Sequence, residues 1–298
     1  MPLPQRVAII GAGLIGRAWA IVFARAGCDV TLYDANPEIT RNAHDAVLKE
    51  VGAAEERVRL ADSLAAALDR ADFVQENTPE TLESKLGIFA ELDKLASLDA
   101  ILASSSSAIV ASRFTKDLHG RQRCLIAHPV NPPHRIPLVE LVGAPWTSAD
   151  TIERARATYA AAGQVPIVVK REIDGFILNR LQAVLLSEAF RLVEEGYVSP
   201  QDLDHTLKDG LGLRWAFMGP FETIELNAPG GIPDYCRRYG ASLAALSGAD
   251  ESIYRSPKLD SILGQWSRTP DAQEIAAKMR WRNRRLGALR AHLKAQPS

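Results

Sequence analysis

A glycine motif between an apolar run and an amphipathic segment constrains the fold of this chain most strongly. Gly11-Ala-Gly13-Leu-Ile-Gly16 follows the run Arg6–Ile10 and opens the helical pattern Leu14–Arg25. In a strand-turn-helix unit, the first glycine allows the tight turn, the second lets the backbone approach a pyrophosphate, and the third permits close helix packing. Free N–H groups and the dipole at the helix start favour an anion there. The motif predicts a dinucleotide site, and the alternative is a turn that binds nothing.

A carboxylate at the end of the next apolar run indicates which dinucleotide this is. Asp34 follows the run Asp29–Tyr33 and lies 23 residues after Gly11, where a carboxylate can hold the ribose hydroxyls of adenosine. The same charge repels a 2′-phosphate, and the following Ala35 and Asn36 offer no arginine to neutralise one. We therefore expect NAD rather than NADP.

From Arg6 to about Val169, short apolar runs alternate with amphipathic stretches, a pattern typical of βαβ units. The runs that we interpret as strands are Arg6–Ile10, Asp29–Tyr33, Phe73–Gln75, Ala100–Ala103, Cys124–Ala127, Leu138–Val142 and Val165–Val169. The helical patterns between them include Leu14–Arg25, Leu82–Leu95 and Ser148–Ala162. Residues 1–172 are therefore predicted to form an α/β domain with a Rossmann-type doubly wound sheet.

The pattern changes to helices after Val169. Ile173–Glu195 is predicted as one long helix, and Ser199-Pro200 supplies a cap and a first-turn proline for the next. The sequence from Pro270 to Ala295 is helical in pattern again, and no strand-like run of comparable quality occurs in between. We expect a second, mostly α-helical domain over residues 173–298, for substrate binding and dimerisation.

The composition disfavours several classes of protein. The 35 basic and 36 acidic side chains give a net charge of −1, whereas a nucleic-acid binder usually carries a basic excess. Cys28, Cys124 and Cys236 lie far apart and show no metal-ligand spacing, so neither a disulfide framework nor a metal site is expected. No signal peptide or membrane span is recognisable, so we expect a cytoplasmic protein. The basic amphipathic stretch Lys278–Lys294 is expected to dock its apolar stripe within the second domain or on a partner subunit.

Polar residues follow the predicted strands at the carboxyl edge of the sheet, where ligands bind in open α/β folds. A serine run ends at Ser107, His128 ends the next strand, and Glu140 lies inside the apolar run Leu138–Val142. A buried glutamate is costly unless paired, so a glutamate beside a histidine indicates a dyad in which the carboxylate fixes the tautomer of the imidazole. Serine runs also cap helices, and Asn179 in the long helix could equally make a hydrogen bond between helices.

Five motifs in this order resemble those of the 3-hydroxyacyl-CoA dehydrogenase family. They are the glycine motif, Ser104–Ser107, His128-Pro-Val-Asn131-Pro, Leu138-Val-Glu140 and Asp174-Gly-Phe-Ile-Leu-Asn179-Arg180. Within the family, stretches such as AHPVNPP and GLGLRWAFMGPFET look most like the λ-crystallin branch, whose active members are L-gulonate 3-dehydrogenases. The resemblance covers nearly the whole chain, and the family is usually dimeric.

The resemblance implies a role for each matching residue. His128 is implied to be the general base with Glu140 as its partner, Ser107 the active serine, and Asn179 the amide that contacts the substrate oxygen. In this scheme His128 removes a proton from a C3 hydroxyl while hydride passes from C3 to the nicotinamide.

The resemblance also implies cofactor contacts. It places Glu80 and Lys85 near NAD, together with the backbone of Leu14 and Ile15 in the glycine loop. Asn131, within the His128 motif, is predicted to be a substrate residue. No metal is implied.

Two departures from the family pattern bear on the substrate. Only 46 positions separate Asp34 from Glu80, whereas members that use coenzyme A typically have a longer helical hairpin there. Arg214 stands where acyl-CoA enzymes usually lack an arginine, and its guanidinium can bind a carboxylate bidentately. A structural salt bridge is an equal alternative for Arg214. We expect a small L-3-hydroxy acid, with L-gulonate as the best guess.

Three other functions stay open. The first is an L-3-hydroxyacyl-CoA dehydrogenase, such as one acting on 3-hydroxybutyryl-CoA, with a trimmed coenzyme A site. The second is an L-carnitine dehydrogenase, in which Trp215, Phe217 or Tyr235 would hold the trimethylammonium group. The third is a non-catalytic, crystallin-like NAD-binding protein. It is disfavoured because all four catalytic candidates are present.

Overall fold

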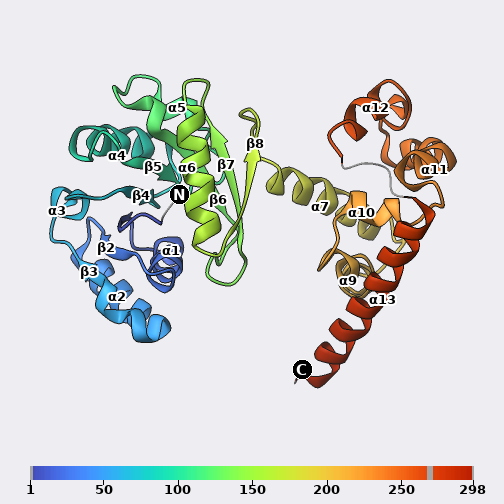
Figure 1. The fold of residues 1–298 in the computed structure, drawn as a ribbon, viewed down its shortest axis with the longest axis horizontal. Helices are drawn as coiled ribbons and strands as arrows, with labels where there is room; N and C mark the ends of the chain where they lie inside the picture. Colours follow the sequence, from blue (N-terminus) through green and yellow to red (C-terminus); the bar gives the residue numbers. More distant parts are fainter. Residues whose placement is uncertain (1–2, 267–270, 297–298) are drawn as a thin grey trace. The chain divides into compact units, whose positions relative to one another are not determined.

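A single eight-stranded sheet organises the first part of the molecule (Figure 1). The computed structural model describes residues 3–266 and 271–296, and the chain divides between Leu185 and Leu186 into two compact units. In the first unit the strand order is β3-β2-β1-β4-β5-β6-β7-β8, and every neighbouring pair is parallel except β6 with β7. The strands are β1 (Arg6–Ile10), β2 (Asp29–Tyr33), β3 (Val58–Leu60), β4 (Phe73–Glu76), β5 (Ile101–Ser104), β6 (Cys124–Pro129), β7 (Leu138–Gly143) and β8 (Val165–Val169).

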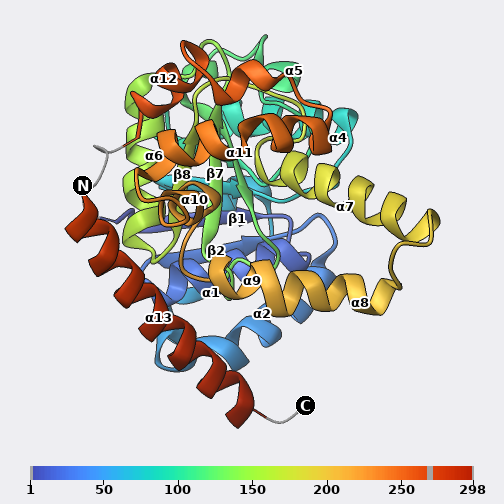
Figure 2. The same ribbon diagram turned by 90° about the vertical axis from the view of Figure 1, so that its right-hand side faces the viewer.

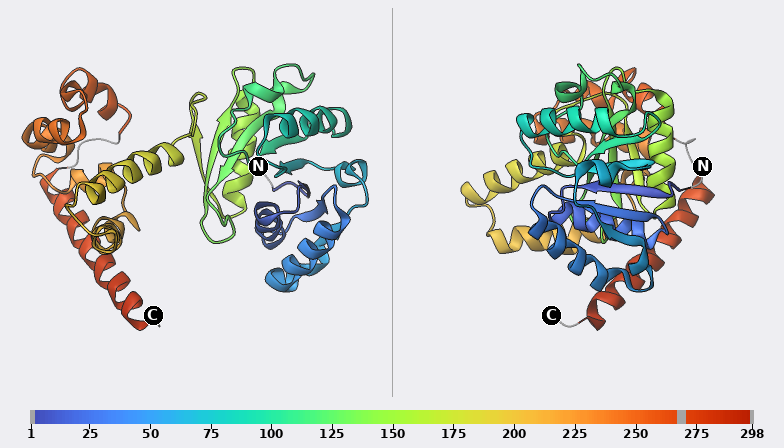
Figure 3. Two further views of the ribbon diagram at one scale, coloured as in Figure 1. Left: turned by 180° about the vertical axis from the view of Figure 1, so that it is seen from behind. Right: turned by 90° about the vertical axis from the view of Figure 1, so that its left-hand side faces the viewer.

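Helices cover both faces of this sheet, as Figure 1 and the view from behind in Figure 3 show. The helical elements are α1 (Leu14–Arg25), α2 (Pro37–Val51), the 3₁₀ turn η1 (Gly52–Arg57), α3 (Leu64–Leu68), α4 (Leu82–Leu95), α5 (Ser112–Thr115), the 3₁₀ turn η2 (Arg121–Arg123) and α6 (Ala149–Ala161). Because side chains alternate along a strand, Val7 and Ile9 join the core under α1, α2 and α6, while Ala8 and Ile10 join the core under α3, α4 and α5. The predicted doubly wound Rossmann-type sheet is confirmed.

Side-chain caps start several of these helices. Asn36 accepts a hydrogen bond from the N–H of Glu38, Thr81 from that of Ser84, and Ser148 from that of Thr151. Such caps satisfy N–H groups that the first turn of a helix leaves free. The starts of α2, α4 and α6 are therefore fixed locally.

The seven predicted strands all form, but the analysis of the sequence missed β3. This strand has three residues, of which only Val58 is buried, and it lies at the sheet edge beside β2. A run so short carries no readable alternation, so only its pairing with Val30 to Leu32 identifies it.

The long helix begins later than predicted. We expected it to start at Ile173, whereas α7 spans Leu178–Glu194. Gly175 and Phe176 have φ of 75° and 50°, in the left-handed region, which a right-handed helix cannot include. The chain therefore makes a separate turn before α7.

The second unit, residues 186–298, is helical throughout the part that the structure describes (Figure 2). Its elements after α7 are α8 (Pro200–His205), the π-helix η3 (Thr206–Leu211), α9 (Gly212–Trp215), α10 (Pro220–Glu225), α11 (Gly231–Ser247), the 3₁₀ turn η4 (Glu251–Tyr254), α12 (Lys258–Leu263) and α13 (Ala272–Ala295). Ser199 caps α8 as predicted, and the predicted start of the last helix at Pro270 lies outside the described residues. Within this unit, the buried Glu225 accepts hydrogen bonds from Trp266 Nε1 (3.0 Å) and Lys278 Nζ (2.8 Å), which ties α10 to α13.

Candidate active site

The glycine loop between β1 and α1 has the geometry that a dinucleotide requires. Gly11 has φ of 88°, and a Cβ added there would lie 2.7 Å from the backbone of Asn77. A Cβ on Gly16 would lie 1.9 Å from the Gly11 carbonyl oxygen, so the helix can pack on the loop only with glycine there. Gly13 faces open space, because nothing lies within 4 Å of an added Cβ. A pyrophosphate can therefore approach the backbone at Gly13 and the start of α1.

The Asp34 carboxylate lies beside this loop at the end of β2. Its Oδ2 accepts a hydrogen bond from the Ala12 N–H (2.9 Å), and its Oδ1 accepts one from the Asn36 N–H (3.0 Å). Each carboxylate oxygen has two lone pairs, so both oxygens keep capacity for ribose hydroxyls. Asp34 thus orients the loop and can still bind a nucleoside.

A cavity of about 830 Å³ opens from the glycine loop over the edge of the sheet. It is lined by Gly11 and Gly13, by Asp34, and by an apolar set that the analysis of the sequence did not identify, which consists of Tyr33, Ile39, Leu64 and Ile88. These apolar residues come from β2, α2, α3 and α4, so no sequence spacing relates them. A cavity with glycine backbone and a carboxylate at one end and apolar walls fits a dinucleotide such as NAD.

The antiparallel pairing of β6 with β7 brings His128 and Glu140 together. They are register partners, and His128 Nδ1 lies 2.8 Å from Glu140 Oε2. Both are buried, with 6% and 1% of their surfaces exposed. Because Glu140 accepts the proton of Nδ1, Nε2 is the ring nitrogen that can accept a proton from another group.

The second oxygen of Glu140 holds the start of α7. Glu140 Oε1 accepts hydrogen bonds from the N–H groups of Ile177 (2.9 Å) and Leu178 (3.1 Å). Burial alone would raise the pKa of Glu140, but the hydrogen bonds from His128, Leu178 and Ile177 outweigh it and lower the pKa from its usual value. Glu140 is therefore held as a carboxylate between the imidazole and the helix.

Ser107 and Asn179 contact each other, and Asn179 follows Leu178, whose N–H binds Glu140. Asn179, in the first turn of α7, donates from Nδ2 to the Ser107 carbonyl oxygen (2.9 Å). Within the part of the chain that the structure describes, the Ser107 hydroxyl has no hydrogen-bond partner. Contacts thus link all four candidates, from Ser107 through Asn179 and the adjoining Leu178 N–H to Glu140 and His128.

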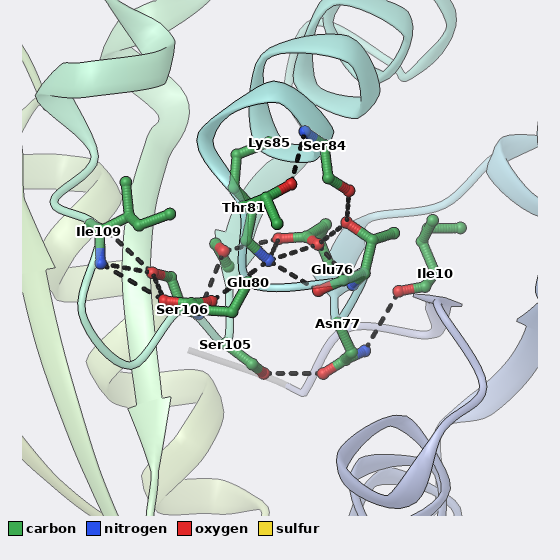
Figure 4. Close-up of polar contacts among 12 residues, drawn as sticks. Ile10, Glu76, Asn77, Glu80, Thr81, Ser84, Lys85, Ser105, Ser106 and Ile109 are labelled. Atoms are coloured by element: carbon green, nitrogen blue, oxygen red, sulfur yellow. Dashed lines mark hydrogen bonds and ion pairs between the residues drawn. The ribbon is translucent and has the colours of Figure 1, made fainter.

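Glu80 fixes the serine loop that contains Ser107, and Figure 4 shows Glu80 against Ser106 of this loop. Its Oε1 accepts hydrogen bonds from the Ser106 hydroxyl (2.7 Å) and from the N–H groups of Ser107 (2.9 Å) and Ala108 (3.0 Å). Burial would raise the pKa of Glu80, but these hydrogen bonds and the charge of Lys85 lower it below its usual value. Glu80 is therefore a carboxylate bound by the loop itself.

Lys85 is turned into the protein. Its side chain is 1% exposed, and Nζ donates to both oxygens of Glu76 (2.9 and 3.0 Å) and to the Thr78 carbonyl (3.0 Å), with Glu80 Oε2 at 3.8 Å (Figure 4). Glu76 also accepts from the Ser104 hydroxyl (2.6 Å). The analysis of the sequence gave Glu76 no role, although an acid at the end of a buried strand needs a partner.

A second polar cluster lies behind the glycine loop and was also not predicted. The Ser105 hydroxyl accepts hydrogen bonds from Trp19 Nε1 (3.0 Å) and Gln75 Nε2 (2.9 Å) and donates to Asn77 Oδ1 (2.7 Å). The Tyr159 hydroxyl donates to Gln75 Oε1, and its burial raises the pKa of this phenol well above the usual value. This cluster joins α1, β4 and α6 to the serine run and fixes Asn77 against Gly11.

The other predicted site residues lie as follows. Leu14 begins α1 and is 70% exposed, while the partly buried Ile15 packs on the core. Asn131 is exposed in the turn after β6. Arg214 lies half-buried in α9 of the second unit, and its guanidinium has no ion-pair partner among the described residues. No metal-ligand cluster occurs in the described parts, and none of their helices is long and apolar enough to cross a membrane.

Comparison with known proteins shows which family the chain resembles. The model described as the NAD-binding domain of 3-hydroxyacyl-CoA dehydrogenase matches residues 6–173, and the model of the C-terminal domain matches residues 175–270. Lambda-crystallin of Oryctolagus cuniculus is 40% identical over 99% of each chain, and the lambda-crystallin homolog of Bos taurus is 43% identical over 94% of this chain and 93% of its own. The crystal structure of a 3-hydroxyacyl-CoA dehydrogenase from Archaeoglobus fulgidus superposes with a TM-score of 0.79 and 26% sequence identity. The match covers 98% of this chain and 100% of the other chain.

Proposed function

Because the chain belongs to the 3-hydroxyacyl-CoA dehydrogenase family and is thus an NAD-dependent oxidoreductase acting on CH–OH groups, we propose that it oxidises the C3 hydroxyl of a small L-3-hydroxy acid. The best candidate substrate is L-gulonate, which would become 3-dehydro-L-gulonate. The observation that carries the proposal is the hydrogen-bonded His128–Glu140 pair, joined through the start of α7 to Asn179 and Ser107.

Each of these residues has a definite task in the proposed reaction. His128 takes the C3 hydroxyl proton at Nε2, because Nδ1 donates its own proton to Glu140. Glu140 stabilises the imidazolium that results. The Ser107 hydroxyl and the second N–H of the Asn179 amide bind the substrate oxygen as its charge changes. NAD, bound at the glycine loop and Asp34, supplies the acceptor for the hydride from C3.

Two observations favour a free acid over a coenzyme A thioester. Between Asp34 and Glu80 the chain forms α2, β3 and the short α3 and returns to the sheet at β4, so no long helical hairpin stands there to pack against coenzyme A. Arg214 has no ion-pair partner within the described residues, which leaves its guanidinium available for a substrate carboxylate. We propose that Arg214 binds this carboxylate and that Asn131 is a further substrate contact.

The first experiment is a substrate panel with purified protein and NAD. We would follow NADH formation with L-gulonate, L-3-hydroxybutyrate, L-carnitine and L-3-hydroxybutyryl-CoA, with His128→Ala protein as the blank. We expect turnover of a free acid and no turnover of the thioester. Preference for the thioester would refute the small-acid assignment, and NAD binding without any turnover would favour the crystallin-like alternative.

Arg214→Met tests the carboxylate contact. A charge-assisted hydrogen bond contributes about 1.5–3 kcal/mol, so the KM for the acid should rise roughly 10- to 150-fold. The affinity for NAD should not change. Arg280→Met, at an exposed position of α13, removes the same charge elsewhere in the second unit and serves as the control. Equal KM values for the two variants would contradict the assignment.

We also propose that the protein is a homodimer. None of the residues of α7 is buried, and Leu181, Val184 and Phe190 are 66%, 72% and 72% exposed. Exposed apolar residues in such number on one helix are typical of an interface. Analytical ultracentrifugation of wild-type and Phe190→Glu protein tests this, and a monomeric wild type would contradict it.

A further inference from the structure

Phe176 combines an unusual backbone conformation with complete burial. Its φ is 50°, in the left-handed region that bulky residues rarely adopt, and its exposed fraction is 0%. Arg70 is the other non-glycine residue with positive φ in the described parts of the chain, and it is exposed. Bulky residues stay in this region only where the surroundings hold them, and such positions concentrate at functional sites.

The Phe176 ring packs on the proposed base. Its centroid lies 5.4 Å from that of the His128 imidazole, with 48° between the ring planes. This distance and tilt are within the range of favourable aromatic pairs. The ring also belongs to the core under α3, α4 and α5, so the imidazole rests on a part of the molecule that is firmly packed.

The Phe176 backbone directs the next two N–H groups at Glu140. Phe176 closes a turn by donating its own N–H to the Ile173 carbonyl (3.1 Å). The chain then enters α7 with the N–H groups of Ile177 and Leu178 on Glu140 Oε1. The left-handed residue is thus the point at which the chain changes direction to place these donors.

From these contacts we propose that Phe176 is a positioning residue for the His128–Glu140 pair. Its ring restrains the imidazole, and its left-handed backbone holds the helix start that orients the carboxylate. The inference rests on the proposed function of this pair in proton transfer. In the sequence, Phe176 is visible only as a member of the Asp174–Arg180 motif, with no role of its own.

Phe176→Leu removes the aromatic ring and keeps an apolar side chain with the same backbone constraint. We expect kcat for the free acid to fall about 10- to 100-fold, as for other small misplacements of a catalytic group. The solvent deuterium isotope effect on kcat should rise because proton transfer becomes slower, and the KM for NAD should stay the same.

Phe114→Leu is the matched control. Phe114 is 2% exposed, lies in the same core and pairs with the ring of Phe89 at 4.7 Å, whereas His128 pairs with Phe176. Phe114→Leu should lower the melting temperature without changing kcat or the solvent isotope effect. If Phe176→Leu and Phe114→Leu behave alike, Phe176 is only a core residue and the proposal is wrong.

A readout independent of turnover separates this inference from the proposed function. The imidazole C–H signals of His128, assigned by NMR with His128→Asn protein, should shift in Phe176→Leu and not in Phe114→Leu. Unchanged signals in both would overturn the positioning role. If the signals shift in Phe176→Leu but the wild-type protein oxidises no substrate of the panel, the packing of Phe176 on His128 is supported and the proposed reaction is refuted.

Two further variants test the backbone. Phe176→Gly and Phe176→Ala both remove the ring, but only glycine adopts positive φ without strain. Phe176→Gly should therefore melt at a temperature equal to or above that of Phe176→Ala, the reverse of the usual order. A clearly higher melting temperature for Phe176→Ala would show that the left-handed conformation does not hold the turn.

Discussion

Glu140→Gln isolates the charge of the carboxylate between His128 and α7. The amide oxygen of glutamine can still accept the N–H groups of Ile177 and Leu178, so α7 should start at the same residue. The amide nitrogen would then face His128 Nδ1, which is a donor in the wild-type pair. The variant therefore loses support for the imidazolium while the fold around it stays the same.

The size of the effect follows from the bond that is lost. The Nδ1–Oε2 contact is 2.8 Å long and buried, and a hydrogen bond to a charged group contributes about 1.5–3 kcal/mol. At about 1.4 kcal/mol per tenfold change, kcat/KM for oxidation of the acid should fall roughly 10- to 150-fold. Initial rates of NADH formation at saturating NAD measure this loss.

The control is Glu153→Gln on the surface of α6, where the carboxylate pairs with Arg156. It removes the same charge from an exposed position and should leave the rate unchanged. If kcat/KM of Glu140→Gln falls by less than about threefold, or roughly 0.65 kcal/mol, the carboxylate does not support the base and the prediction is refuted. Circular dichroism of both variants checks that the fold is kept.

Two further predictions concern the acidic groups around the serine loop. The folded-state pKa of Glu80 is lowered, so its contribution to stability is complete above about pH 4.3, the usual pKa of this side chain, and is lost as pH falls through the lower folded value. Glu80→Gln should thus unfold in less urea than the wild type at about pH 7, with the difference shrinking at about pH 3; a constant difference would contradict this. Lys85→Met leaves the Glu76 carboxylate buried without its counter-charge and should lower the free energy of unfolding by about 3–5 kcal/mol. Lys94→Met, on the exposed side of the same helix, should change it by less than about 0.5 kcal/mol, and equal losses in both would refute the role of the buried pair.

Most strands of the sheet could be predicted from the sequence because each strand is marked by a run of adjacent residues. The strands of this sheet are short runs of mostly apolar and β-branched residues, so the runs Arg6–Ile10 and Asp29–Tyr33 were readable with their bounds, and α1 and α4 also start and end as predicted. β3 has only three residues, which is too few to show such a run. The start of α7 was placed too early because an apolar periodicity does not report the left-handed φ of Phe176.

Residue types beside strands and helices located the dinucleotide loop, seven of the eight strands, His128 and Glu140, and the resemblance to the family added roles for Ser107 and Asn179. Which of these groups are in contact depends on the tertiary packing. The antiparallel pairing of β6 with β7 puts Glu140 against His128, and the turn at Phe176 brings the N–H groups of α7 to the same carboxylate. These contacts join residues far apart in the chain, and their register depends on the packing of the whole sheet, which no local pattern of residues contains.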